Sequence, residues 1–313
     1  SIIEEPQYTS STVNTIQWIG SDTPSGIYYY KVECSTSSDF SSILSSGVTN
    51  TDSYTFDGLE SGLTYYYRVC AVDRAGNISL WSVTHSLQDN ELPSEFTLIA
   101  PNDGYRSTST YITFQWQDST DTISGIQKYV IQIYEQITNL KVVENELITV
   151  STSITLQEGR YYWYVETIDR AGNLRRSTTM YFLYVDTTPP TISNWGPQQN
   201  GQIDRSQTYL NINFSEAMKE DISVTSDNFP ISASTFTWVS NSQLKIEFPQ
   251  LHMGQTYYLI LNSPDVTSVF ADLAGNVLHT STITFFVTLV PKSQITVSDN
   301  YLQFKTCLLY TSD

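Results

Sequence analysis

Two stretches of the chain decide the fold: LTYYYRVCAVDRAGN, residues 63–77, and RYYWYVETIDRAGN, residues 160–173. Tyr and Val recur along both, as expected of half-buried antiparallel β-strands. Both stretches end in Asp-Arg-Ala-Gly-Asn, in which Gly and Asn accept the left-handed backbone angles of a tight turn. A more distant third copy reads QTYYLIL, residues 255–261, followed by DLAGN, residues 272–276. We therefore predict one fold that is used three times along the chain.

The rest of the repeat keeps the same order. A strand ends at Trp18 in the first copy and at Trp116 in the second, and a Ser-Gly-Ile step follows at residues 25–27 and 124–126. In the third copy the corresponding strand, LNINF, ends at Phe214, and SEAMKED replaces the Ser-Gly-Ile step. The first two copies are close versions of one fold, and the third is a more distant version.

Length and composition agree with this reading. At roughly 100 to 150 residues per domain, a chain of 313 residues holds two or three domains. Turn residues interrupt the chain at short intervals, and it has no long Ala/Leu/Glu/Lys stretch of the kind that helices favour. The predicted fold class is all-β, with three tandem antiparallel β-sandwiches of immunoglobulin or fibronectin type III type.

Residues 1–88 and 94–187 resemble fibronectin type III domains of bacterial secreted proteins. The resemblance rests on the strand-ending tryptophans, on the Tyr that opens each Tyr-rich strand, and on the AVDRAGN and TIDRAGN endings. It implies that Tyr65 and Tyr161 are tyrosine-corner residues, whose hydroxyls bind the nearby backbone.

The third copy resembles a different family. Residues 188–290 contain INFSEAM and DLAGN, and they resemble the bacterial immunoglobulin-like domains found beside surface-layer and wall proteins. We refer to residues 1–88, 94–187 and 188–290 as modules one, two and three.

Short segments separate and follow the modules. QDNELP, residues 88–93, and DTTPP, residues 186–190, are Pro-containing linkers that restrict bending, and they predict a semi-rigid rod. Residues 291–313 contain the alternating run ITVSDNYLQF, which we interpret as an extra strand of a truncated next module. The last seven residues, CLLYTSD, resemble a translated adapter remnant and are assigned no function.

Three cysteines make a disulfide framework improbable in this chain. Cys34 and Cys70 fall on strands that such sandwiches place side by side. By alternation Cys34 shares the core face with Val32, whereas Cys70 points outward, and opposite faces cannot be bridged without distortion. We expect two free thiols.

Charge and motifs exclude several functions. The net charge of −17 opposes binding to nucleic acid or anionic lipid, and no apolar run is long enough for a membrane span. His85, His252 and His279 are scattered, and no nucleophile-elbow, zinc-protease, Cys-x-x-Cys or phosphate-loop motif occurs. We predict that the chain is not an enzyme.

A calcium site at each junction is the one candidate cofactor site, and a structural role for the same acids is weighed against it. The loops that precede the Ser-Gly-Ile step and that hold the Asp-x-Ala-Gly-Asn turn lie at the pole that receives the preceding linker. Calcium binds six to eight oxygens from carboxylates, carbonyls and water. The candidate ligands are Asp89, Glu91, Asp118, Asp121 and Asp169 at the first junction, and Asp186, Glu216 and Asp272 at the second.

A structural role for the same acids is the alternative. The Asp of Asp-x-Ala-Gly-Asn can accept hydrogen bonds from backbone amides a few residues later. Module one has the same residue, Asp73, with no preceding module in view, which favours the hairpin role. Both interpretations stay open at this point.

Aromatic side chains offer a second kind of site, because sugar-binding sandwiches stack pyranose rings on Tyr or Trp. The alternative is cross-strand pairing, which stabilises sheets by roughly 0.2 to 1 kcal/mol per pair. The candidates are Tyr28, Tyr66, Tyr162, Trp81, Trp195 and Trp238.

Our leading functional hypothesis is a non-catalytic spacer or adhesive stalk of a bacterial cell-surface or secreted protein. The alternative is an accessory segment of a secreted polysaccharide-degrading enzyme, for which carbohydrate binding is one role to consider. A third hypothesis is self-association, in which ITVSDNYLQF completes a neighbour's sheet by strand addition. The expected location is extracellular, and the expected partners are surface proteins or polysaccharide.

Overall fold

Almost all the regular structure of the chain is β-strand. The computed structural model describes residues 1–23, 25–198, 200–264 and 266–288, and its one helical element in those ranges is a 3-10 turn, η1 (Ile231–Ala233). This confirms the predicted all-β class with tandem β-sandwiches. The predicted extra strand and Cys307 lie outside the described residues. Within the described ranges no helix could cross a membrane.

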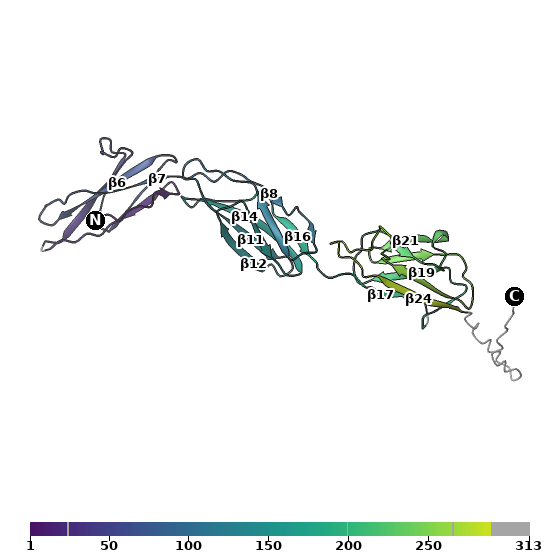
Figure 1. The fold of residues 1–313 in the computed structure, drawn as a ribbon. Helices are drawn as coiled ribbons and strands as arrows, with labels where there is room; N and C mark the ends of the chain where they lie inside the picture. The colour runs from purple at the N-terminus through teal and green to yellow at the C-terminus, as the bar shows by residue number, and fades with distance from the viewer. Residues whose placement is uncertain (24, 199, 265, 289–313) are drawn as a thin grey trace, which may run out of the picture. The chain divides into compact units, whose positions relative to one another are not determined.

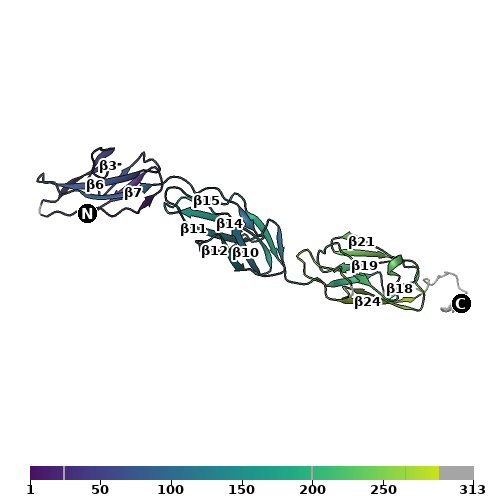
Figure 2. The same ribbon diagram turned by 45° about the horizontal axis from the view of Figure 1, so that its top comes forward.

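Module one packs two sheets around a core that contains Ile16, Trp18, Val32 and Tyr67. The larger sheet has the order β1-β7-β6-β3-β4, and β2 pairs with β5 in the smaller one. Figure 2 shows β3, β6 and β7 side by side. The strands are β1 (Tyr8–Thr9), β2 (Asn14–Gln17), β3 (Ile27–Ser35), β4 (Ser45–Thr49), β5 (Ser53–Phe56), β6 (Thr64–Asp73) and β7 (Ser82–Gln88).

Module two has the same plan, with Phe114, Trp116, Ile131 and Trp163 in its core. One sheet has the order β13-β10-β8, and the other has β12-β11-β14-β16-β9, with β15 also paired to β14. Its strands are β8 (Leu98–Ala100), β9 (Tyr105–Ser107), β10 (Tyr111–Trp116), β11 (Ile126–Glu135), β12 (Lys141–Leu147), β13 (Ser151–Thr155), β14 (Gly159–Asp169), β15 (Leu174–Arg176) and β16 (Tyr181–Val185).

Module three has its own core, which includes Leu210, Phe214, Leu259 and Phe285. Its two sheets have the orders β17-β19-β22-β21 and β18-β24-β23-β20. The strands are β17 (Ile192–Gly196), β18 (Gln202–Asp204), β19 (Tyr209–Phe214), β20 (Val224–Thr225), β21 (Thr235–Ser240), β22 (Gln243–Glu247), β23 (Thr256–Leu261) and β24 (Ser281–Thr288).

The three hydrophobic cores belong to two compact units of the chain. Modules one and two fall in one compact unit, and module three falls in another.

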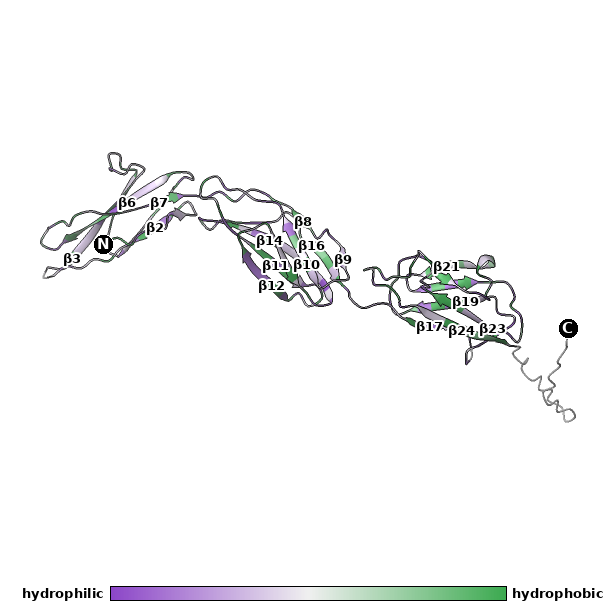
Figure 3. Cartoon of the chain, viewed as in Figure 1, coloured by the Kyte–Doolittle hydropathy of each residue, from purple (hydrophilic) through white to green (hydrophobic). Residues whose placement is uncertain are grey.

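Hydropathy within the modules follows burial: β24 is largely hydrophobic, and edge strand β12 is hydrophilic (Figure 3). An acidic, hydrophilic edge strand discourages pairing with other chains.

The two predicted tyrosine corners are present. The Tyr65 hydroxyl accepts a hydrogen bond from the backbone amide of Glu60 at 2.8 Å, and the Tyr161 hydroxyl donates to the carbonyl of Gln157 at 3.0 Å. Module three has an unpredicted counterpart at Tyr257, whose hydroxyl accepts from the amide of His252 at 3.1 Å. The same device therefore anchors the Tyr-rich strand of every module.

Both thiols of module one are free, as predicted. Cys34 lies in the core, and burial raises its pKa to about 12. Cys70 is directly opposite Lys31 on the other face of the sheet, but it is buried as well, and this burial also raises its pKa. Alternation gave the correct face for Cys70, although it did not show that this face would be covered.

The tyrosine corner of module one makes a testable contribution to stability. Tyr65→Phe removes the acceptor of the Glu60 amide, so it should lower the free energy of unfolding of module one by about 1 kcal/mol. Urea unfolding followed by hydrogen exchange in β6 measures this change. Tyr28→Phe is the control, because Tyr28 is 63% exposed. Equal effects of the two substitutions would contradict the assigned role of Tyr65.

Candidate functional site

The Asp-x-Ala-Gly-Asn turn is held by the side chain of its own Asp. In module two the Asp169 carboxylate accepts hydrogen bonds from the backbone amide and from the Nδ2 of Asn173, both at 2.8 Å. Gly172 has φ 96°, a left-handed angle that side-chain-bearing residues rarely adopt. The hairpin role that the sequence offered as the alternative to calcium is therefore present.

Three carboxylates meet at the pole of module two. One oxygen each from Asp89, Asp121 and Asp169 lies within 4.8 Å of the other two. Asp89 directly follows β7, Asp121 precedes β11, and Asp169 ends β14. The side chains of Asp89 and Asp169 are fully buried. The linker thus brings an acid from the end of module one onto two acids of module two.

Backbone amides compensate part of this charge. The Oδ1 of Asp121 accepts from the amides of Ser124 and Gly125, both at 2.8 Å. Burial opposes ionisation of Asp121, but the amides outweigh it and hold its pKa below the usual value. Asp89 accepts from the amides of Glu91 at 3.0 Å and Ser124 at 3.2 Å.

Asp169 has the opposite balance. Burial is the largest effect and raises its pKa, and the charge of Asp89 adds to it, while the hydrogen bonds from Asn173 oppose both. At Asp169, burial and the charge of Asp89 therefore outweigh the hydrogen bonds.

A second group of the same kind lies in module three. One oxygen each from Asp186, Glu216 and Asp272 again lies within 4.8 Å of the other two, and Asp272 is 1% exposed. Asp272 accepts from the amide of Asn276 at 3.0 Å and from its Nδ2 at 2.7 Å. The same Nδ2 also donates to the backbone carbonyl of Asp186 at 2.7 Å.

Two of the predicted ligands lie outside these groups. Asp118 accepts a hydrogen bond from the hydroxyl of Tyr129, which engages its carboxylate in module two. Glu91 is exposed and contributes only its backbone amide to the first group. The structure brings together Asp89, Asp121 and Asp169 at the first junction, and all three predicted acids at the second.

Spacing within each group suits calcium. Oxygens on opposite sides of a Ca²⁺ ion are about 5 Å apart, because each lies about 2.3 to 2.6 Å from the ion. Three oxygens within 4.8 Å of one another can therefore share one ion. A basic side chain lies near each group. A terminal nitrogen of Arg170 is 3.8 Å from the place where a β-carbon on Gly125 would sit. Lys219 Nζ is 3.5 Å from the corresponding place on Gly275.

The candidate sugar-binding aromatics are engaged with other side chains. Tyr162 stacks on its cross-strand partner Tyr134, with ring centroids 5.0 Å apart and planes within 2°. Tyr66 stacks on His85. Tyr28 packs edge-on against its neighbour, Trp81 lies against Arg68, and Trp195 and Trp238 pack on core phenylalanines. Cross-strand pairing is therefore present at Tyr162 and Tyr66, whereas Tyr28 and Trp81 make contacts of other kinds.

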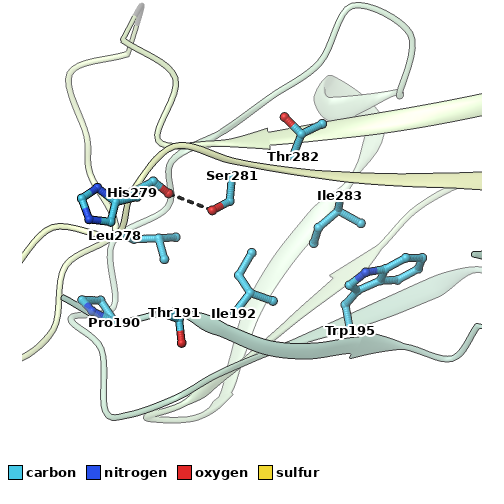
Figure 4. A pocket seen from close by; sticks show the side chains of 9 residues that line it. All are labelled: Pro190, Thr191, Ile192, Trp195, Leu278, His279, Ser281, Thr282 and Ile283. Atoms are coloured by element: carbon cyan, nitrogen blue, oxygen red, sulfur yellow. Dashed lines mark hydrogen bonds between the residues drawn. The ribbon is translucent and has the colours of Figure 1, made fainter. Parts of the chain in front are cut away.

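Trp195 also borders a groove of about 380 Å³ in module three, between the start of β17 and the start of β24. Figure 4 shows Ile192 and Ile283 on its facing walls and the hydrogen bond from the Ser281 hydroxyl to the carbonyl of His279. Its walls are mainly apolar, and the Trp195 ring packs 5.9 Å from that of Phe285. The groove holds no group of acids.

Comparison with known proteins supports part of the predicted relationship. Residues 5–86 match the fibronectin type III domain family, so the chain contains such a domain. The chain is 28% identical over 188 residues to Exoglucanase B of Cellulomonas fimi, a match that covers 58% of this chain and 16% of that protein. This chain therefore spans about a sixth of that relative's length.

Solved structures give weaker matches. The fibronectin(III)-like modules of CbhA from Clostridium thermocellum have a TM-score of 0.45 and 15% identity, over 59% of this chain and 94% of theirs. An I-band fragment of titin has a TM-score of 0.43 and 12% identity, over 92% of this chain and 96% of its own. None of these matches bears on the resemblance of residues 188–290 to surface-layer domains, which stays a prediction.

Asp73 and Asp169 occupy the same position in two copies of one hairpin, yet we expect them to titrate on opposite sides of 3.8. The pKa of Asp73 is lowered, first by the side chain of Asn77, and that of Asp169 is raised by burial. As pH falls, protonation of Asp73 should remove the stability that its ionised form gives module one. Protonation of Asp169 should relieve the cost of its buried charge and so stabilise the folded state of module two. Carboxyl-carbon NMR shifts followed against pH test this, and a shared pKa would contradict it.

Proposed function

We propose that this chain is a non-catalytic spacer segment of a secreted bacterial polysaccharide-degrading enzyme. One observation carries the proposal: the match to Exoglucanase B covers 188 residues, about the length of two modules, but only 16% of that protein. A shared piece of this size fits an accessory region better than a catalytic domain. The same relationship supports an extracellular location.

The geometry of the acids supports a non-catalytic role. A glycosidase needs two carboxyl groups that flank a bond in an open cleft, about 5 to 9.5 Å apart according to mechanism. Asp89 and Asp169 are fully buried and accept hydrogen bonds from backbone amides, so a sugar cannot reach them. Fibronectin type III domains are in general non-catalytic modules.

Both leading hypotheses from the sequence are non-catalytic, and the relative supports a segment of an enzyme. Exoglucanase B favours a segment of an enzyme over an adhesive stalk. The stacking of Tyr162 on Tyr134 and of Tyr66 on His85 supports a structural role for these two tyrosines, because each stack covers one face of the ring.

Calcium at the two acid groups is the second part of the proposal. Removing three carboxylates from water, two of them completely, is unfavourable unless the charge is balanced. The backbone amides supply partial charges, and Arg170 and Lys219 lie near the groups, yet burial and the charge of Asp89 still raise the pKa of Asp169. A divalent cation would balance each group and join each linker to the module that follows it.

The spacer role is tested by placing the whole chain between a cellulase catalytic domain and a cellulose-binding module. The expected result is unchanged activity on a soluble substrate and higher activity on insoluble cellulose than in a fusion with a short linker. The chain alone should neither hydrolyse cellulose nor sediment with it.

Three outcomes would contradict the spacer role. One is hydrolysis by the chain alone, and another is tight binding of the chain alone to cellulose. The third is equal activity of the two fusions on insoluble cellulose.

Calcium binding is tested by thermal and chemical unfolding with calcium and with a chelator. At about 100 times its dissociation constant, calcium should raise the free energy of unfolding of the module that binds it by about 2.7 kcal/mol. Asp89→Asn should remove the gain in module two, and Asp186→Asn should remove it in module three.

Asp118→Asn is the matched control, because its carboxylate contacts Tyr129 and lies outside the group of three. It should retain the full effect of calcium. An effect that survives the double substitution Asp89→Asn and Asp186→Asn would place calcium elsewhere, and no effect in the unmodified chain would remove the site.

A further inference from the structure

Module one has a cavity at the pole that carries its Asp-x-Ala-Gly-Asn hairpin. A space of about 210 Å³ lies between the loop before β3 and the hairpin after β6. Its polar walls include Asp22, Asp73 and Asn77, and Ile27 and Ile78 add apolar surface. We call this cavity and its walls the pole socket.

Modules two and three show what the equivalent place holds. In module two, Asn173 Nδ2 donates to the backbone carbonyl of Asp89 at 3.0 Å. In module three, Asn276 Nδ2 donates to the carbonyl of Asp186 at 2.7 Å. In both, the Asn belongs to the Asp-x-Ala-Gly-Asn hairpin, and the carbonyl belongs to the first residue after the last strand of the preceding module.

The docked linker changes the exposure of the hairpin. Asp169 and Asp272 are buried, and their counterpart Asp73 is only half-buried. Asn276 is buried, whereas Asn77 is exposed. Module one thus exposes polar groups that the other two modules cover with a linker.

The hairpin of module one has already adopted the receptive geometry. The Asp73 carboxylate accepts from the Asn77 amide at 2.8 Å and from its Nδ2 at 2.6 Å, as in module two. The amide of Arg74 donates to the carbonyl of Gly26 at 3.1 Å, and the equivalent bond of Arg170 to Gly125 is 3.0 Å. An incoming linker would need no rearrangement of this hairpin.

We infer that the pole socket is the docking site for the linker of a further β-sandwich module, one whose last strand is followed at once by Asp. The carbonyl of that Asp would accept from Asn77 Nδ2. Its carboxylate would join Asp22 and Asp73, which the hydroxyl of Ser25 already bridges at 2.8 and 3.0 Å. The occupant is therefore a segment like Gln88-Asp89 or Val185-Asp186.

The inference rests on hydrogen bonding by the hairpin, but docking also brings three carboxylates together. Hydrogen exchange is therefore measured both with calcium and in a chelator, and Asp73 is titrated in the chelator.

The test joins residues 94–190 to the N-terminus of the whole chain. Asp186 then lies as far before Ser1 as it does before Thr191 in module three. The anchors also correspond, because the carbonyl of Thr191 accepts from Ser215 at 2.8 Å and that of Ser1 accepts from Ile19 at 2.9 Å.

Docking should slow hydrogen exchange of the Asn77 backbone amide in the fusion by about tenfold relative to the unfused chain. It should also move the pKa of Asp73 from below its usual value to above it, as burial does for Asp169. Unchanged exchange and an unchanged Asp73 pKa would overturn the inference.

Asn77→Ala, made in both the fused and the unfused chain, is the control. It removes the Nδ2 donor, so the difference in exchange between the two chains should disappear. A difference that persists would mean that the added module protects the pole without using the socket, which also overturns the inference. If Asn77→Ala unfolds the hairpin in the unfused chain, the Asp73 titration of the unsubstituted pair decides the question alone.

Discussion

The bond between an aspartate and the asparagine four residues later is the interaction on which each module depends. It closes the turn after the long Tyr-rich strand, and it fixes the Asn amide so that a second hydrogen can point away from the hairpin. In modules two and three that hydrogen meets a linker carbonyl. One side chain therefore both ends a strand and receives the neighbouring linker.

Such an arrangement has an electrostatic cost that rises with burial. A lone hairpin Asp in contact with water is stabilised by its amides, as the lowered pKa of Asp73 shows. In module two the linker covers the hairpin and brings a second acid, Asp89, and the pKa of Asp169 is raised instead of lowered. At the junction, Asp89 and Asp169 lose contact with water where the linker packs on module two. The chain as a whole also carries an excess of acids.

The sequence was most informative where a periodic pattern meets a fixed topology. Alternation identified the strands. The common pole of two loops predicted a group of five acids at the first junction, of which Asp89, Asp121 and Asp169 lie together. Local competition limited the prediction, because Asp118 has the same side chain but accepts a hydrogen bond from the Tyr129 hydroxyl. Pairing patterns reveal which strands lie together, but not which hydroxyl a given carboxylate will meet.

Coverage of a surface was equally hard to foresee. Cys70 lies on the face opposite the core and is buried nonetheless, because neighbouring side chains can cover an outer face in ways that alternation does not encode. Tyr257 shows the converse case: the pattern that marked Tyr65 and Tyr161 also occurs in QTYYLIL, yet the divergence of the third copy concealed its tyrosine corner.

The two unpaired thiols have a practical consequence. With its described cysteines buried and its Cys34 pKa raised to about 12, module one offers almost no reactive thiolate while it is folded. Opening of the module would expose both sulfurs at once. The rate at which Cys34 and Cys70 are alkylated therefore reports the unfolding of module one in the presence of the other two modules, without an engineered label.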